Sequence, residues 1–143
     1  MVAPVFREDK VAQYYLPEGT WTELLTGETK EGGRWFQGTY DYFSMPLYVR
    51  ENSIVVRGNC DTRPDYDYAD HATVCVYQLK DAAETKVPYI HGNNVFTVKA
   101  VKDGDTVKVF VEGAHTELKV EVFVGNEKKE AVLAADANEV VVA

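Results

Sequence analysis

The sequence has few cysteines and lacks any long apolar run. Cys60 and Cys75 are the only two among 143 residues, and no C-x-x-C spacing or nearby histidine cluster accompanies them. We therefore expect reduced thiols and predict neither a disulfide scaffold nor a zinc site. No segment approaches the roughly 20 apolar residues that cross a bilayer. The first residues have neither a basic leader nor a long apolar stretch, so we expect a cytoplasmic protein.

Positive charge is also scarce. The chain has 15 Lys and Arg against 23 Asp and Glu, a net charge of -8. Nucleic acids and anionic membranes attract proteins through Lys and Arg, so neither is an expected partner. Hydrophobic residues make up 45% and aromatic residues 12% of the chain, spread over its whole length, which is typical of globular proteins. This length fits one ordinary domain or two small ones.

Helical periodicity is nearly absent, whereas short segments rich in Val, Tyr, Phe, Trp and Thr recur between Gly, Asp, Asn and Pro. This pattern is typical of a sandwich or barrel. The expected strands are 11–16, 20–25, 34–43, 47–50 and 53–57, then 72–79, 94–101, 106–112, 118–124 and 139–142. A break near 59–63 divides them. We predict an all-β fold with two small antiparallel β-sandwich-like units in tandem, residues 1–60 and 61–143.

Three short segments are expected between strands. Lys102–Asp105 predicts a hairpin turn, because it places Gly between two alternating segments. Asp81–Lys86 is read as a helical turn or a loop, and the charged run Glu127–Glu130 as a solvated turn.

Proline and glycine mark the turns of the first unit. Pro17 fixes φ and Gly19 tolerates a positive φ, so we expect this turn to fold the Tyr14–Tyr15 strand back against the strand of Trp21. Pro46 suits the first position of a strand, where no ladder donor is lost. These residues are assigned structural roles.

The first unit is small for an independent domain. A unit of under about 60 residues is marginal alone, and Val2–Phe6 reads as strand material whose beginning is missing. Exposed apolar side chains beside an unpaired strand edge favour pairing with a second copy. We therefore expect weak self-association.

An ordered series of segments resembles the proximal C-terminal sandwich of glycoside hydrolase family 31. These segments are Tyr14–Thr22, Leu25–Glu28, Gly32–Trp35 and Met45–Ile54. Arg63–Asp70 resembles the entry to the distal sandwich in the alpha-xylosidase branch. The resemblance adds Arg50 and Arg63 as structural residues.

Enzymes of this family are retaining alpha-glycosidases whose two catalytic Asp residues lie on barrel loops. No position here corresponds to either residue. The resemblance therefore implies that the chain itself is not an enzyme and needs no cofactor. It would instead cover and stabilise the catalytic barrel of a parent enzyme, and that barrel would be its main partner.

Two groups of side chains offer alternatives to a purely structural role. The aspartates Asp61, Asp65, Asp67 and Asp70 are close enough in sequence to suggest calcium or acid and base chemistry. The spacing lacks the Gly and Glu of an EF-hand loop, so we favour a structural loop held by turns and Arg63. His71, His91 and His115 form no triad pattern and are read as loop histidines. No catalytic or metal-binding residue is predicted.

Aromatic residues form the second group. Trp35, Tyr66 and Tyr68 are candidates for sugar contact, within a wider set that includes Tyr40, Tyr42 and Tyr48. Aromatic residues at strand spacing more often pack in cores or interfaces, and we favour packing. The alternative functions are a stand-alone carbohydrate-binding module and a β-sandwich interaction domain.

Overall fold

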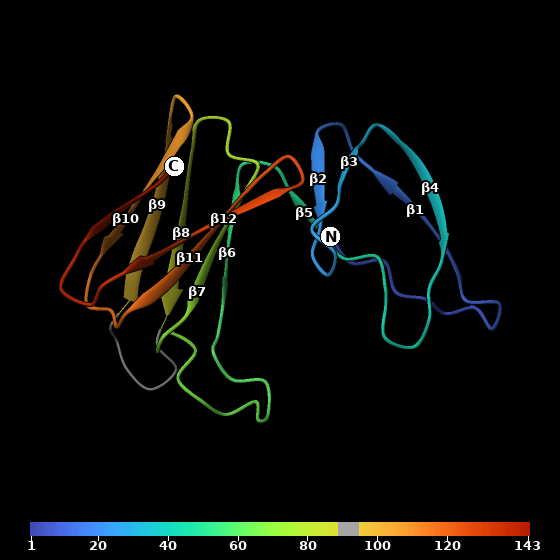
Figure 1. Cartoon of the computed structure of the whole chain (residues 1–143). Coiled ribbons are helices and arrows are strands. Elements are labelled where there is room, and N and C mark those ends of the chain that lie inside the picture. The colour runs from blue at the N-terminus through green and yellow to red at the C-terminus, as the bar shows by residue number, and fades with distance from the viewer. Residues whose placement is uncertain (89–94) are drawn as a thin grey trace. The chain divides into compact units, whose positions relative to one another are not determined.

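A computed structural model describes residues 1–88 and 95–143. This part of the chain contains thirteen strands and no helix, and hence no helix that could span a membrane (Figure 1). The predicted all-β fold is confirmed. The chain divides into two compact units, Met1–Glu51 and Asn52–Ala143. The division lies before residue 60 because β6 (Ser53–Arg57), which the pattern grouped with the first unit, pairs with β7 (Thr73–Tyr77) of the second.

The first unit consists of two small sheets. Their strands are β1 (Val11–Leu16) with β4 (Arg34–Thr39), and β3 (Thr29–Glu31), β2 (Thr20–Glu23) and β5 (Tyr48–Arg50) in that order. Its buried core comprises Ala12, Tyr14, Leu16, Trp21 and Tyr48. Alternate residues of β1 supply three of these, as a strand with one buried face should.

The Pro17–Gly19 turn connects two strands that do not pair with each other. Gly19 has the expected positive φ of 118°, but β1 pairs with β4 and β2 pairs with β3 and β5. The backbone of Gly32 and Gly33 fills the place that a hairpin would need. The Gly32 N–H donates to the Gly19 carbonyl, 2.8 Å away, and the Gly33 N–H donates to the Leu16 carbonyl, 2.7 Å away. The Tyr14 and Trp21 strands therefore belong to different sheets, and the two side chains meet in the core of the unit rather than in one hydrogen-bonded ladder.

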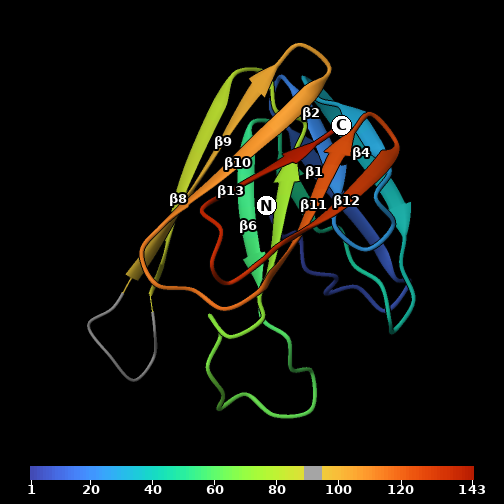
Figure 2. The ribbon, with the colours of Figure 1, turned by 60° about the vertical axis from the view of Figure 1, so that its left-hand side comes forward.

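The second unit is a sandwich of two four-stranded sheets (Figures 1 and 2). One sheet has the order β13 (Glu139–Val142), β10 (Thr106–Glu112), β9 (Val95–Asp103) and β8 (Ala82–Pro88). The other has the order β12 (Glu127–Leu133), β11 (Leu118–Val124), β7 and β6. All of these pairs are antiparallel, as predicted, except β7 with β11, which run parallel.

Two edge strands replace segments predicted to be irregular. β8 covers the stretch read as a helical turn or loop, and β12 covers the run read as a solvated turn. Each pairs with one neighbour, β8 with β9 and β12 with β11. Charged side chains are tolerated on such edges because one side of the strand faces water. The hairpin turn between β9 and β10 is confirmed, with Gly104 at a φ of 61°.

The core of the second unit lies between the two sheets. Inward residues of β7 and β11 meet inward residues of β9 and β10, and all are almost fully buried. They include Val74, Val76, Val120, Val122, Phe96, Val98, Val107 and Val109. Their alternation with polar residues along β10 and β11 is the period-2 pattern that predicted these two strands.

Candidate functional site

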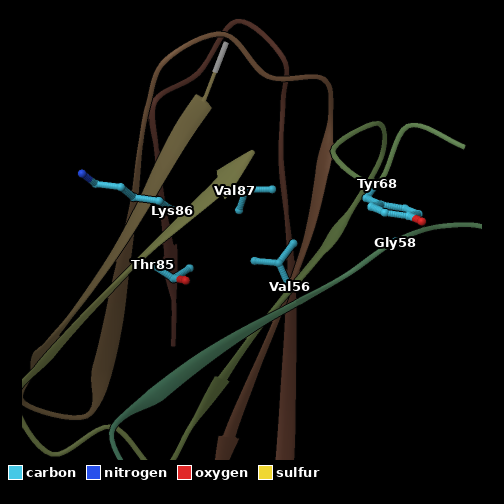
Figure 3. A pocket seen from close by; sticks show the side chains of 6 residues that line it. All are labelled: Val56, Gly58, Tyr68, Thr85, Lys86 and Val87. Carbon is cyan, nitrogen blue, oxygen red and sulfur yellow. The ribbon is translucent and has the colours of Figure 1, made fainter. Parts of the chain in front are cut away.

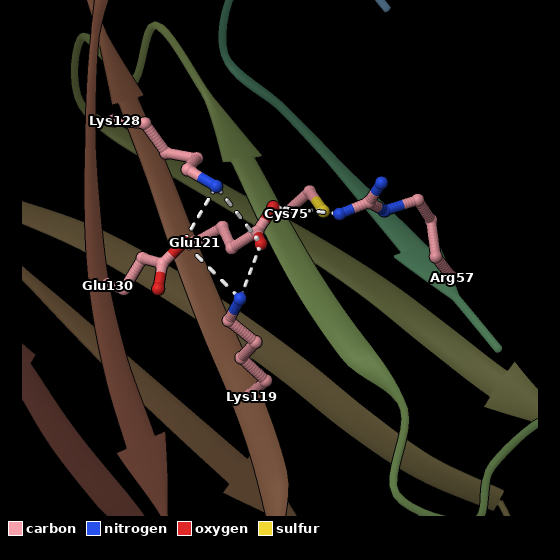
Figure 4. Close-up of polar contacts among 6 residues, drawn as sticks. All are labelled: Arg57, Cys75, Lys119, Glu121, Lys128 and Glu130. Atoms are coloured by element: carbon pink, nitrogen blue, oxygen red, sulfur yellow. Dashed lines mark hydrogen bonds and ion pairs between the residues drawn. The ribbon is translucent and has the colours of Figure 1, made fainter. Parts of the chain in front are cut away.

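The most buried charge in the described residues lies on the outer face of the second sheet (Figure 4). Glu121 is 4% exposed and lies on β11, opposite Glu130 of β12 and Cys75 of β7. Its Oε2 lies 2.7 Å from Arg57 Nη2, and its Oε1 lies 3.0 Å from Lys119 Nζ. The Cys75 thiol donates to Oε2 across 3.7 Å.

Two lysines link Glu121 to Glu130. Lys128 Nζ lies 3.5 Å from Glu121 Oε1 and 2.6 Å from Glu130 Oε1, and Lys119 Nζ lies 3.2 Å from the same Glu130 atom. We call Arg57, Cys75, Lys119, Glu121, Lys128 and Glu130 the Glu121 cluster. Its three cations come from three different strands, so the cluster ties β6, β11 and β12 together across the sheet.

The charges of the Glu121 cluster decide what it can do chemically. Burial alone would raise the pKa of Glu121, but Lys119, Arg57 and Lys128 outweigh burial and hold this pKa below its ordinary value. Burial raises the pKa of the Cys75 thiol, so the thiol stays protonated at neutral pH. Glu121 is therefore a neutralised carboxylate without a spare proton, and Cys75 is not an activated nucleophile. The cluster is a stabilising ion network.

A hollow of about 320 Å³ opens between the edge strands β6 and β8 (Figure 3). Val56 and Val87 face into it, Lys86 points away, and Tyr68 lies at its far side. The two valines belong to the sandwich core or pack against it. Among its described lining residues, Thr85 and Tyr68 carry hydroxyls, Lys86 carries a cation and none carries a carboxylate.

The aspartate-rich loop is held by its own turns. The Asp67 carboxylate accepts from the Ala69 N–H at 3.0 Å, and Asp70 Oδ1 lies 2.8 Å from His71 Nδ1. In the described ranges, no three His, Cys, Asp or Glu side chains converge as metal ligands would. Arg63 is exposed and lines a shallow hollow with Tyr66.

The remaining predicted residues lie in loops or on strands of their own unit. Arg50 is exposed on β5 opposite Trp21, and Pro46 is buried just before that strand. The His115 ring lies in the β10–β11 loop, with its nitrogens 2.7 Å from the Thr116 carbonyl and 3.0 Å from that of Ala137. His91 lies outside the described residues.

Tyr66 and Tyr68 use their hydroxyls inside the loop. The Tyr68 hydroxyl donates to the Pro64 carbonyl at 2.5 Å, and the two rings meet edge to face at 4.6 Å. The Tyr66 hydroxyl packs so closely on Gly58 that a Cβ there would lie 2.1 Å from its oxygen. Both tyrosines therefore act in holding the loop, although Tyr68 is 43% exposed.

Trp35 differs from these tyrosines. Its side chain is 72% exposed, so it does not pack in a core within this chain; packing in an interface, the other part of the preferred interpretation, stays a prediction. Tyr15, which was not a candidate from the sequence, lies opposite Trp35 in the β1–β4 pair, with ring centroids 5.7 Å apart.

Other apolar side chains of the first unit are exposed as well. Those of Tyr42, Phe43 and Phe6 are exposed at 94%, 89% and 90%. Val2 forms a bridge with Leu47, and Val5 packs against the core of the unit.

A partly buried polar cluster supports the first unit from within. The Tyr14 hydroxyl lies 2.8 Å from that of Tyr48 and 3.0 Å from that of Tyr40, and Lys30 Nζ donates to the Tyr48 hydroxyl at 2.8 Å. Burial raises the pKa of Tyr40 to about 12. These phenols are therefore neutral at physiological pH, and the cluster joins β1, β3 and β5.

Comparison with known proteins identifies the family. Residues 67–143 match the family model "Alpha-xylosidase YicI, C-terminal domain", and residues 1–55 match "Glycosyl hydrolase family 31 C-terminal domain". The chain belongs to the C-terminal region of glycosyl hydrolase family 31, as its resemblance predicted. The two matches leave residues 56–66 between them.

Individual relatives agree with this assignment. The chain is 30% identical to alpha-xylosidase XylQ of Lactiplantibacillus pentosus over 131 residues, which cover 89% of this chain and 17% of XylQ. It matches the solved family 31 alpha-xylosidase of Xanthomonas citri with a TM-score of 0.71 and 25% identity, over 99% of this chain and 18% of that one.

A more distant match supports the fold alone. The cycloalternan-forming enzyme of Listeria monocytogenes superposes with a TM-score of 0.80 at 17% identity, over 99% of this chain and 17% of that one. The chain thus spans about a sixth of the length of the curated relative and solved structures named here.

Proposed function

We propose that this chain is the non-catalytic C-terminal region of an alpha-xylosidase, where its two units cover and stabilise a catalytic barrel. The observation that carries the proposal is the pair of family matches. Together they account for residues 1–55 and 67–143 while the chain spans only 17% of XylQ. The activity of the whole enzyme would then depend on residues outside this region.

The chemistry of the described residues supports a non-catalytic role. Retaining glycoside hydrolysis needs two carboxyl groups placed on either side of a sugar, one of them with a raised pKa. The pKa of Glu121 is lowered, and three cations surround its carboxylate. Asp67 and Asp70 make hydrogen bonds within their own loop.

An activity assay tests the first half of the proposal. The purified 143-residue chain should hydrolyse aryl alpha-xylosides no faster than buffer does. Turnover that disappears when Asp65 and Asp67 are both changed to Asn would contradict the proposal and place catalysis in the acidic loop.

A hybrid enzyme tests the second half. The region of XylQ that matches this chain is replaced by residues 1–143, and a truncated XylQ without the region serves as control. The hybrid should melt at a higher temperature than the truncated enzyme and retain alpha-xyloside hydrolysis. Equal melting temperatures for the two proteins would argue against a stabilising role.

A further inference from the structure

The outward face of the β1–β4 pair carries no charged side chain. Alternation along the two strands turns one set of residues into the core and the other outward. The outward set is Val11, Gln13, Tyr15, Trp35, Gln37 and Thr39. Charged residues make up 27% of the chain, so a face of six neutral residues favours a neutral ligand over a charged one.

Two aromatic rings dominate this neutral face. Trp35 is 72% exposed and Tyr15 is 43% exposed, and their rings are inclined at 59°. Both residues belong to strands whose opposite face is fixed by the buried Tyr14 and Leu16. The rings are therefore presented by a rigid element rather than by a loop, which lowers the entropy lost when a ligand binds.

Two amides lie beside the rings. Gln13 and Gln37 form the next cross-strand pair on the same face, roughly 7 Å along the strands from Tyr15 and Trp35. Gln13 Nε2 donates to Gln37 Oε1 at 2.5 Å. This bond leaves the Gln13 carbonyl oxygen as an acceptor and the Gln37 amide nitrogen as a donor for a ligand. A hollow of about 230 Å³ is lined by Gln13, Trp35 and Gln37, with Phe36.

We propose that this face binds neutral oligosaccharides, with one pyranose ring against the Trp35 indole and hydroxyls of the neighbouring sugar on Gln13 and Gln37. Sites of this kind combine an apolar, aromatic surface with a few placed polar groups that fix orientation. The site goes beyond the proposed function and does not depend on it.

A second exposed aromatic pair lacks this combination. Tyr42 and Phe43 meet edge to face at 5.5 Å in a turn closed by Asp41, whose carboxylate accepts from the Ser44 hydroxyl at 2.7 Å. A carboxylate rather than an amide pair thus stands beside these rings. They provide a matched control with exposed rings in the same unit.

An NMR titration of the 15N-labelled 143-residue chain tests the proposal. The chain has two tryptophans, and Trp21 is buried with its indole N–H bound to the Pro17 carbonyl at 2.8 Å. Maltopentaose and a xyloglucan heptasaccharide are the probes. The Trp35 indole resonance should shift saturably with a Kd on the order of 1 mM, whereas the Trp21 resonance should stay in place.

Variants distinguish stacking of a sugar on Trp35 from nonspecific binding to exposed aromatic rings. Trp35→Ala should weaken binding by about tenfold or more, the typical effect of losing a central aromatic contact. Trp35→Phe should retain part of the affinity, and Gln37→Leu should weaken it by a smaller factor. Phe43→Ala should leave the affinity unchanged.

Three results would overturn the proposal. They are the absence of a saturable Trp35 shift, an unchanged affinity in Trp35→Ala, and a loss of affinity in Phe43→Ala equal to that in Trp35→Ala. If Trp35→Ala lowers the melting temperature of the XylQ hybrid while the chain binds no sugar, the face docks protein instead. The hydrolysis and hybrid assays do not measure sugar binding, so their failure is distinguishable from failure here.

Discussion

Changing Glu121 to Gln removes the negative charge at the centre of the Glu121 cluster while keeping the side-chain volume. Arg57 would then lose the carboxylate it pairs with, and Lys119 and Lys128 would keep only that of Glu130. We expect the second unit to lose stability, because the carboxylate is buried and its replacement leaves charged hydrogen bonds unmade.

The size of the loss follows from the exposure of the partners. Removing one partner of a fully buried ion pair costs about 3–5 kcal/mol. The Glu121 side chain is 5% exposed, but those of Arg57, Lys119 and Lys128 are 50%, 45% and 44% exposed. The cations therefore recover much of their hydration in the variant, and we expect a loss of about 1–2 kcal/mol. For a unit of this size, each kcal/mol lowers the Tm by about 4–8 °C.

The assay has to report on the second unit. Both tryptophans, Trp21 and Trp35, lie in the first unit, so their fluorescence monitors only that unit. Hydrogen exchange of the β11 amides, measured at increasing urea concentrations, reports the stability of the second unit directly. The urea midpoint of tryptophan fluorescence should stay unchanged in the variant and serves as an internal control. Glu130→Gln is the matched variant; its side chain is 44% exposed, so solvent screens its ion pairs and we expect a smaller loss than for Glu121→Gln.

The same variant predicts a pH dependence. The pKa of Glu121 in the folded chain lies below its ordinary value of 4.5, because the ion pairs outweigh burial. A depressed folded pKa contributes stability that is present above the unfolded pKa and is lost as pH falls through the folded pKa. The difference between wild type and Glu121→Gln should thus persist above pH 4.5 and shrink below it. Equal losses in Glu121→Gln and Glu130→Gln, or a difference that grows on acidification, would refute this reasoning.

Two further predictions concern single residues. Cys60 is partly exposed, and its hydrogen bond with Thr62 lowers its pKa, so an aromatic disulfide reagent should label this thiol in the native chain. Cys75 should be labelled only in urea, because it is buried and its pKa is raised; two native thiols reacting equally fast would contradict this. Gly32→Ala should destabilise the first unit by about 1–3 kcal/mol, since the new Cβ would lie 1.8 Å from the Pro17 carbonyl oxygen. Tryptophan fluorescence in urea measures this loss, and an unchanged midpoint would show that the backbone accommodates the methyl group.

Five strands were predictable to the residue. Segments 11–16, 53–57, 106–112, 118–124 and 139–142 match β1, β6, β10, β11 and β13. Most of these segments alternate apolar and polar residues, and alternation reflects burial on one side of a sheet. β3, β8 and β12 were not predicted, because each is an edge strand with one neighbour and edge strands carry charges such as those of Lys128 and Glu130. Local sequence also did not indicate that β1 pairs with β4, which lies beyond two intervening strands.

The Glu121 cluster was missed for a related reason. Glu121 lies between Val120 and Val122, which places it on the face expected to be wet. It is buried because Cys75 and Arg57 approach from strands far away in sequence, and the parallel register of β7 with β11 leaves no local signal. Trp35 was a candidate from the sequence, but its exposure depends on the pairing that places it outward beside Tyr15.

The parallel pairing of β7 with β11 joins a strand to a partner that follows it in the chain only after three other strands. Parallel neighbours need a long crossover connection, and here the crossover contains β8, β9 and β10 of the opposite sheet. Their hairpins are local and form quickly, whereas β7 has one open edge until residues 118–124 arrive. At about 5–20 residues per second, the ribosome needs several seconds to add this stretch. During synthesis, β7 is therefore the segment where pairing with another chain competes with folding.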